Sequence, residues 1–175
     1  MASPTSPART LLLLAACVLA CAWGCAQDAP KWESHVVNEP DGATVTELSL
    51  QGVYRTPPSI VKAQPAMVIQ CANGKVLNSY FSFGAVLSQY AAGLHPVELE
   101  LYLDNVRRPI FSDSLNEDGT SAYFSHKELK RILAVHELRV GAVEFAGPQM
   151  QATFILPDIT PVIAACGEDP ILKRK

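Results

Sequence analysis

The feature that most constrains the fold is a strict alternation of apolar and polar residues over positions 97–103. The odd-numbered positions are apolar, namely Val97, Leu99, Leu101 and Leu103. The even-numbered positions are Glu98, Glu100 and Tyr102. Because successive side chains of a β-strand point to opposite sides, this pattern predicts a strand with one buried and one solvent-facing side. We expect the four aliphatic side chains to face the core, with Leu129, Ile132 and Leu133 packed nearby.

Turn residues divide the rest of the chain into further short segments with strand character. Asn73–Gly74 tolerates the left-handed angles of a tight turn and predicts a hairpin, and residues 112–119 are expected to form a polar loop. We predict roughly seven strands, with 32–37 as a weaker candidate. Strand-like segments occupy 44–50, 66–71, 75–83, 97–103, 106–111, 138–145 and 149–156.

Two helices are expected among these strands. Ser125 and Glu128 form a capping box, and Thr160 followed by Pro161 is typical of the start of a short helix that ends near Cys166. Four residues after the capping box recur at helical spacing and predict about three turns: Leu129, Ile132, Leu133 and His136. The predicted fold class is therefore mainly β, a single-domain sandwich or open barrel with one amphipathic helix and a short C-terminal helix.

Composition limits the classes of protein to which the chain can belong. It has 175 residues, of which 49% are hydrophobic and 18% charged, values that suit one compact domain and argue against disorder. The formal net charge is -3, which gives no overall electrostatic attraction to nucleic acid. We therefore expect a folded domain that does not bind nucleic acid.

Residues 1–26 have the layout of a secretory signal peptide: one charge at Arg9, an apolar run over 11–22, and small residues before a cut after Ala26. Cys17 and Cys21 each follow a lipobox-like sequence, so lipidation at either cysteine is the alternative processing route. The remaining residues, 27–175, form the single predicted domain. The expected location is the periplasm, or the outer membrane if the chain is lipid-anchored, with the lipid as its one contact with a membrane.

Cleavage after Ala26 leaves Cys71 and Cys166 as the remaining cysteines. An even pair in an exported protein most often forms a disulfide, so we predict that these two are bonded, with their Cα atoms within about 7 Å. A reactive thiol is the alternative. Neither cysteine lies in a C-x-x-C motif or has a histidine close in sequence that would favour the thiolate.

Four segments together are similar in order and spacing to the VasI-like family of small exported bacterial proteins, over about residues 32–166. Phe111 stands where that family commonly has a tryptophan. The resemblance implies an association with type VI secretion, although similar domains occur in exported proteins without that link. The segments that carry the resemblance are Pro65–Cys71, Leu101–Asp104, Leu129–Val140 and Ala152–Cys166, preceded by the opening Trp32–Asp41.

Patterns typical of catalysis or metal binding are weak in this sequence. The four histidines are His35, His95, His126 and His136, and none has the spacing of a zinc motif. His136 is expected at a helix end, where its charge would be favoured by the helix dipole. No phosphate loop, dinucleotide-binding motif or nucleophile elbow is present. We therefore predict no catalytic, cofactor-binding or metal-binding residues.

Two motifs allow a weaker functional interpretation beside the favoured structural one. Glu98 and Glu100 lie on one strand face about 7 Å apart, a spacing that can serve glycoside hydrolysis, although a solvated strand face is the favoured interpretation. Asn116, Asp118 and Gly119 resemble part of a calcium loop, but the acidic residue needed at its last position is absent, which favours a polar turn.

These observations favour a non-enzymatic exported protein that acts by binding, as a possible accessory of a secretion or envelope assembly. The expected partner is another envelope protein. The alternative is an envelope hydrolase with a site built from Glu98, Glu100 or a histidine.

Overall fold

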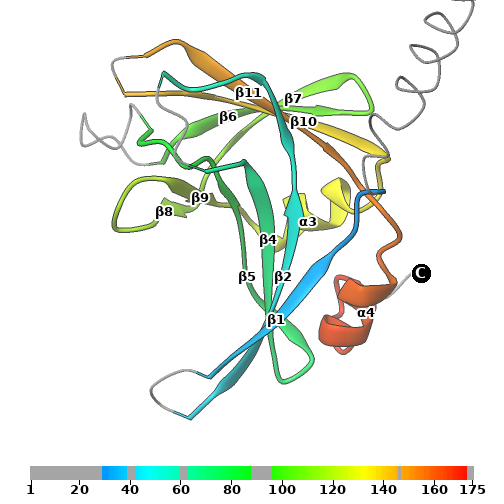
Figure 1. The fold of residues 1–175 in the computed structure, drawn as a ribbon. Coiled ribbons are helices and arrows are strands. Elements are labelled where there is room, and N and C mark those ends of the chain that lie inside the picture. The colour runs from blue at the N-terminus through cyan, green and yellow to red at the C-terminus, as the bar shows by residue number, and fades with distance from the viewer. Residues whose placement is uncertain (1–28, 39–41, 60–62, 88–95, 146, 173–175) are drawn as a thin grey trace, which may run out of the picture.

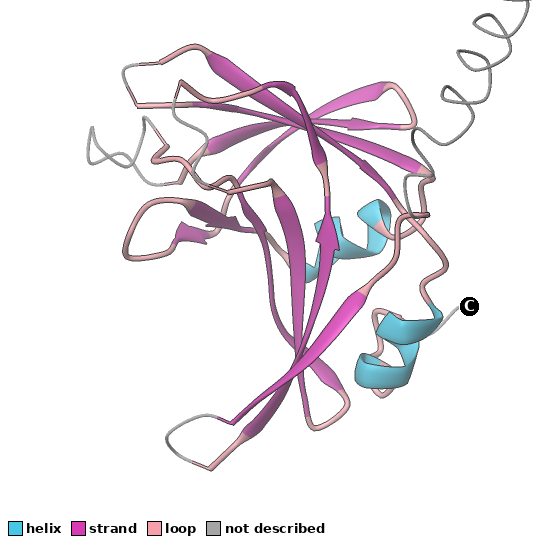
Figure 2. Ribbon diagram, in the orientation of Figure 1, coloured by secondary structure: helices cyan, strands magenta, loops and turns pink. Residues whose placement is uncertain are grey.

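Two antiparallel β-sheets pack face to face in a computed structural model that describes residues 29–38, 42–59, 63–87, 96–145 and 147–172 (Figures 1 and 2). This mainly-β sandwich with two helices confirms the predicted fold class. The predicted signal peptide with Cys17 and Cys21, and also His95, lie outside the described residues.

Sheet A contains six strands in the order β1-β2-β4-β5-β9-β8. Asn73 and Gly74 connect β4 to β5 with positive φ angles of 52° and 72°, as the Asn-Gly hairpin prediction requires. The strands of sheet A are β1 (Glu33–Asn38), β2 (Thr44–Gln51), β4 (Ala66–Ala72), β5 (Lys75–Ser82), β8 (Ser114–Leu115) and β9 (Ser121–Tyr123).

Sheet B contains five strands in the order β3-β11-β10-β6-β7. The chain passes from sheet A to sheet B at Gly52, where a Cβ atom would lie 2.6 Å from the Phe154 ring, so this corner needs a residue without a side chain. The strands of sheet B are β3 (Val53–Thr56), β6 (Glu98–Leu103), β7 (Val106–Phe111), β10 (Glu137–Val143) and β11 (Gln149–Ile155).

The alternating segment has the predicted register. Val97, Leu99 and Leu101 are fully buried between the sheets, while Leu103 packs against the core from a half-buried position. Glu98 is exposed on the opposite side of β6. Leu129, Ile132 and Leu133 are buried in the same core, so the prediction that they join the aliphatic strand residues is confirmed.

Helix α3 (His126–Ile132) begins as predicted but is shorter than predicted. The Ser125 side chain caps it by accepting a hydrogen bond from the Glu128 N–H. The expected third turn is wrong, and His136 lies beyond the helix, because Asp104 accepts hydrogen bonds from the N–H groups of His136 and Glu137 at 3.0 and 2.8 Å. These hydrogen bonds therefore direct the chain into β10, which begins at Glu137, instead of extending the helix.

Helix α4 (Thr160–Cys166) lies beside sheet A, and Cys166 at its end is bonded to Cys71 of β4 with a Cα–Cα distance of 5.4 Å (Figure 1). The predicted disulfide is confirmed. The predicted capping role of Thr160 is wrong, because Asp158 accepts hydrogen bonds from the backbone and hydroxyl of Thr160. Thr160 is consequently the first helical residue.

The structure also corrects the number of strands, which is eleven in the described ranges. The segment 112–119 is not entirely loop, because β8 lies within it, and β3 and β9 were not predicted. These strands have two to four residues each, too few to show a periodicity. None of the helices in the described ranges has the length and apolar character that crossing a membrane requires.

Candidate binding face on sheet B

Three ion pairs between described residues lie on the solvent face of sheet B. Its residues come from all five strands and lie on the side opposite the buried aliphatic residues. We call this surface the sheet B face. Its members include Arg55, Glu98, Glu100, Tyr102, Arg107, Phe111, Glu137, Arg139, Gly141, Val143, Gln149 and Thr153.

Glu100 is the centre of the first polar network on this face. One of its carboxylate oxygens accepts a hydrogen bond from Arg107 Nε on β7 at 2.5 Å. The other accepts from Gln149 Nε2 on β11 at 3.0 Å. Glu100 therefore links β7, at the edge of the sheet, to β11, which lies on the other side of β10.

Gly141 makes that link possible. It lies on β10 directly opposite Glu100 and between β6 and β11. A Cβ atom at this position would lie 3.1 Å from Gln149 Nε2 and 3.4 Å from the Glu100 Cβ atom. The missing side chain leaves room for the carboxylate and amide groups to meet above the middle strand.

The hydrogen bond from Arg107, followed by that from Gln149, lowers the pKa of the Glu100 carboxyl group below its ordinary value of 4.5. Glu100 is thus held ionised, with a hydrogen bond to each oxygen. A glycosidase general acid needs a raised pKa so that it is protonated at working pH. Within the pair Glu98–Glu100, Glu100 is unsuited to that role.

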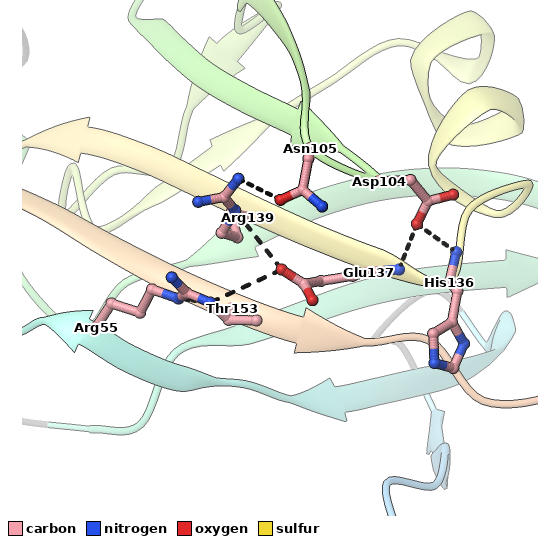
Figure 3. A network of polar contacts seen from close by, with 7 residues as sticks. All are labelled: Arg55, Asp104, Asn105, His136, Glu137, Arg139 and Thr153. Atoms are coloured by element: carbon pink, nitrogen blue, oxygen red, sulfur yellow. Dashed lines mark hydrogen bonds and ion pairs between the residues drawn. The ribbon is translucent and has the colours of Figure 1, made fainter.

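A second network surrounds Arg139 on β10 (Figure 3). Its guanidinium carbon lies 4.7 Å from the centre of the Tyr102 ring, and its Nη2 donates to Asn105 Oδ1 at 2.7 Å. Its Nε lies 3.6 Å from a carboxylate oxygen of Glu137. Arg139 is therefore fixed on three sides, and its side chain is only 18% exposed.

Arg55 extends this network to the edge of the sheet. Its Nη2 lies 3.9 Å from the same Glu137 carboxylate oxygen, and its Nε donates to Thr153 Oγ1 at 3.0 Å. Glu137 thus lies between two arginines from different strands, as Figure 3 shows. Each exposed ion pair contributes little to stability alone, but together they hold the side chains in defined positions.

Apolar side chains interrupt the charged surface near β7. Phe111 is 64% exposed and lies opposite Glu98, and Val143 is 38% exposed on β10. A shallow pocket of about 340 Å³ lies between Glu98, Glu100, Arg107, Val143 and Gln149 and is open to solvent. The two predicted carboxylates therefore line one pocket, although not a deep cleft.

The described histidines are dispersed. His35 lies exposed on β1 opposite Glu47, and His136 is exposed beyond α3. His126 lines a different pocket with Asp113 and Ser114, but no hydrogen bond among the described residues joins its ring to either side chain. No group of three or more histidine, cysteine, aspartate or glutamate residues is placed to hold a metal ion in the described ranges.

The calcium-like segment is a polar turn, as the favoured interpretation predicted. Asn116 Oδ1 accepts hydrogen bonds from the backbone N–H groups of Thr120 and Ser121, both at 2.8 Å. Gly119 has a φ of 67°, which suits a residue without a side chain. The side-chain oxygen of Asn116 therefore serves to close the β8–β9 turn.

Sequence reasoning missed Arg55, Arg139 and Gln149 as parts of this face. The two segments that contain Arg139 and Gln149 were predicted as strands, and residue parity along them separates Arg139 from the buried Leu138 and Val140. That parity was an available signal. The pairing that brings these residues to Glu100 and Tyr102 was not, because it depends on strand order.

Comparison of the chain with protein-family models, curated proteins and solved structures finds no match. The resemblance to the VasI-like family accordingly stays a prediction.

Proposed function

We propose that this chain is an exported cell-envelope protein that acts by binding another envelope protein through the sheet B face. The observation that carries the proposal is the pair of ordered networks whose three arginines and two glutamates come from four strands and bond to Gln149 and Thr153 of the fifth. Side chains already fixed in the free protein lose little conformational entropy when a partner binds. Arginine, tyrosine and phenylalanine are also enriched at protein interfaces, and this face presents Tyr102 and an exposed Phe111 beside the network.

The occupied hydrogen bonds of the face support a macromolecular partner over a small molecule. In the pocket beside Glu98, the side chains of Glu100, Arg107 and Gln149 are already bonded to one another, whereas a small-molecule site presents polar groups that can orient a ligand. A role in secretion or envelope assembly rests on the signal-like residues 1–26 and on the VasI-like resemblance.

Co-purification from the native envelope with two matched variants tests this proposal. Phe111→Ala removes a 64% exposed side chain from the sheet B face, and Val36→Ala removes a 66% exposed side chain from β1 of sheet A. The wild type and Val36→Ala should retain the same stoichiometric partner, and Phe111→Ala should lose it. Equal recovery with all three proteins would contradict the assignment to this face.

Export itself is a separate part of the proposal, with the periplasm or the outer membrane as the location. The mass of the protein from its native envelope distinguishes cleavage after Ala26 from acylation at Cys17 or Cys21. An uncleaved chain in the cytoplasm would overturn this part.

An envelope hydrolase is the second candidate, because Glu98 and Glu100 line the same pocket. Glu98 would have to supply the acid, since Glu100 is held ionised. Hydrolysis of a glycan substrate that Glu98→Gln abolishes while leaving the fold intact would place this function ahead of binding. Retained activity in Glu98→Gln, or no activity in the wild type, would rule out the hydrolase function.

A further inference from the structure

A second pocket is lined by residues of sheet A and of the segments beside it, and it shares no residue with the pocket of the sheet B face. It has a volume of about 340 Å³ and lies between β5, the β8–β9 hairpin and the start of α3. This volume falls at the lower end of the ~300–1,000 Å³ typical of small-molecule sites. Its polar and aromatic lining includes Asn78, Asp113, Ser114, Tyr123 and His126.

A pair of tyrosines forms the aromatic part of this region. Tyr80 on β5 and Tyr123 on β9 are directly opposite each other, with ring centres 5.0 Å apart and planes inclined at 48°. Their neighbours Phe81 and Ala122 point to the core, so both tyrosines point to solvent and are half-buried. Tyr123 therefore offers a supported but accessible ring at the pocket.

Hydrogen bonds hold the surroundings of the tyrosine pair in place. Asn78 Nδ2 donates to Gln70 Oε1 at 3.2 Å, and Gln70 Nε2 donates to Glu47 Oε2 at 3.1 Å. Burial, followed by the nearby Glu47 charge, raises the pKa of Tyr80 to about 12, so its hydroxyl group stays protonated. This chain of contacts orients the Asn78 amide and fixes which of its atoms remain available.

The polar groups at the pocket itself are open. Within the part of the chain that the structure describes, no hydrogen bond engages the Asp113 carboxylate, the His126 ring or Asn78 Oδ1. On the sheet B face, by contrast, the carboxylates of Glu100 and Glu137 are paired with arginine side chains. Open polar groups that converge beside an aromatic ring are the arrangement by which small-molecule sites orient a ligand.

The chemistry of these groups selects the ligand class. Asp113 and Asn78 Oδ1 are hydrogen-bond acceptors, so they suit a ligand that presents donors, and the hydroxyl groups of a sugar are such donors. The described lining contains the acidic Asp113 and no lysine or arginine, which disfavours a phosphate or another anion. The Tyr123 ring suits the apolar C–H side of a sugar ring. We propose that this pocket binds one pyranose unit of a neutral oligosaccharide.

Calorimetric titration of the purified chain with maltotriose, cellotriose and triacetylchitotriose tests the proposal. One of these should bind with one site per chain, and Asp113→Ala, which removes only an exposed carboxylate, should weaken binding about tenfold. Tyr123→Leu should remove binding, while Tyr123→Phe should retain it because the ring is kept. Nuclear magnetic resonance should place the shifts in β5, β9 and the start of α3.

Val106→Ala on sheet B, which truncates a 69% exposed side chain at the start of β7, is the matched control and should bind the sugar with unchanged affinity. Retained affinity in this variant would show that binding depends on the pocket and not on exposed apolar side chains elsewhere. The inference is overturned if none of the three trisaccharides binds at millimolar concentration. It is equally overturned if binding persists unchanged in both Asp113→Ala and Tyr123→Leu.

Discussion

The solvent faces of the two sheets use similar residues in opposite ways. On the sheet B face, Glu100 and Arg139 are each held by several partners from neighbouring strands. At the sheet A pocket, Asp113 and His126 line open space beside the Tyr80–Tyr123 pair. We infer that charged side chains already bonded to one another suit a macromolecular partner, whereas charged side chains without such bonds suit a small ligand.

The two sheets also differ in how they are anchored. The Cys71–Cys166 bond attaches α4 to sheet A, and Asp169 beyond that helix accepts a hydrogen bond from the Val76 N–H at 3.1 Å. Sheet B has no such covalent attachment among the described residues. Sheet A therefore depends on the C-terminal segment in a way that sheet B does not.

The largest expected effect follows from removal of that attachment. The double substitution Cys71→Ala with Cys166→Ala should lower the free energy of unfolding by about 4 kcal/mol, because the bond closes a loop with a sequence separation of 95 residues. Denaturant unfolding measures the loss. Hydrogen exchange should accelerate more in β4, β5 and α4 than in β6 and β10, and uniform acceleration would contradict the difference in anchoring.

A smaller effect is expected at alkaline pH. Because the folded-state pKa of Tyr80 is raised from 10.0 to about 12, it contributes stability below pH 10 that is lost as the pH rises through 12. Tyr80→Phe should flatten this decline. In absorbance titrations, Glu47→Gln should lower the pKa of Tyr80 but leave it above 10, because burial, its largest cause, remains. An unchanged pKa of Tyr80 in this variant would show that Glu47 does not interact with the Tyr80 hydroxyl group.

The smallest effect is expected at acid pH on the sheet B face. The lowered pKa of Glu100 gives stability that is present above its ordinary pKa of 4.5 and lost as the pH falls through the lower folded value. Glu100→Gln should show a shallower acid decline than the wild type in unfolding experiments. Identical pH profiles would show that the Arg107–Glu100–Gln149 network is not formed in solution.

The sequence predicted those parts of the molecule that depend on local pattern. The alternation around Leu99 and Leu101 gave the correct buried face, and Asn73–Gly74 gave the correct hairpin. The Ser125–Glu128 pair gave the correct start of α3. In each case the deciding interaction lies within a few residues, so a single sequence contains it.

The errors and omissions depend on long-range contacts. Asp104 ends the predicted helix early by binding backbone groups more than 30 positions away in the chain. The link from Glu100 to Gln149 needs three strands in the correct order and a glycine between them. Tyr80 and Tyr123 become neighbours only when β9 pairs with β5. None of these contacts has a local sequence signal.

Site-specific photocrosslinking in the native envelope is the sharpest test of binding through the sheet B face. A photoreactive residue at Phe111 reports on the sheet B face, and one at Val36 reports on β1 of sheet A with a similar exposure, 64% against 66%. One discrete crosslinked envelope protein is expected from position 111 and none from position 36. The same product from both positions, or a product from position 36 alone, would contradict binding through the sheet B face.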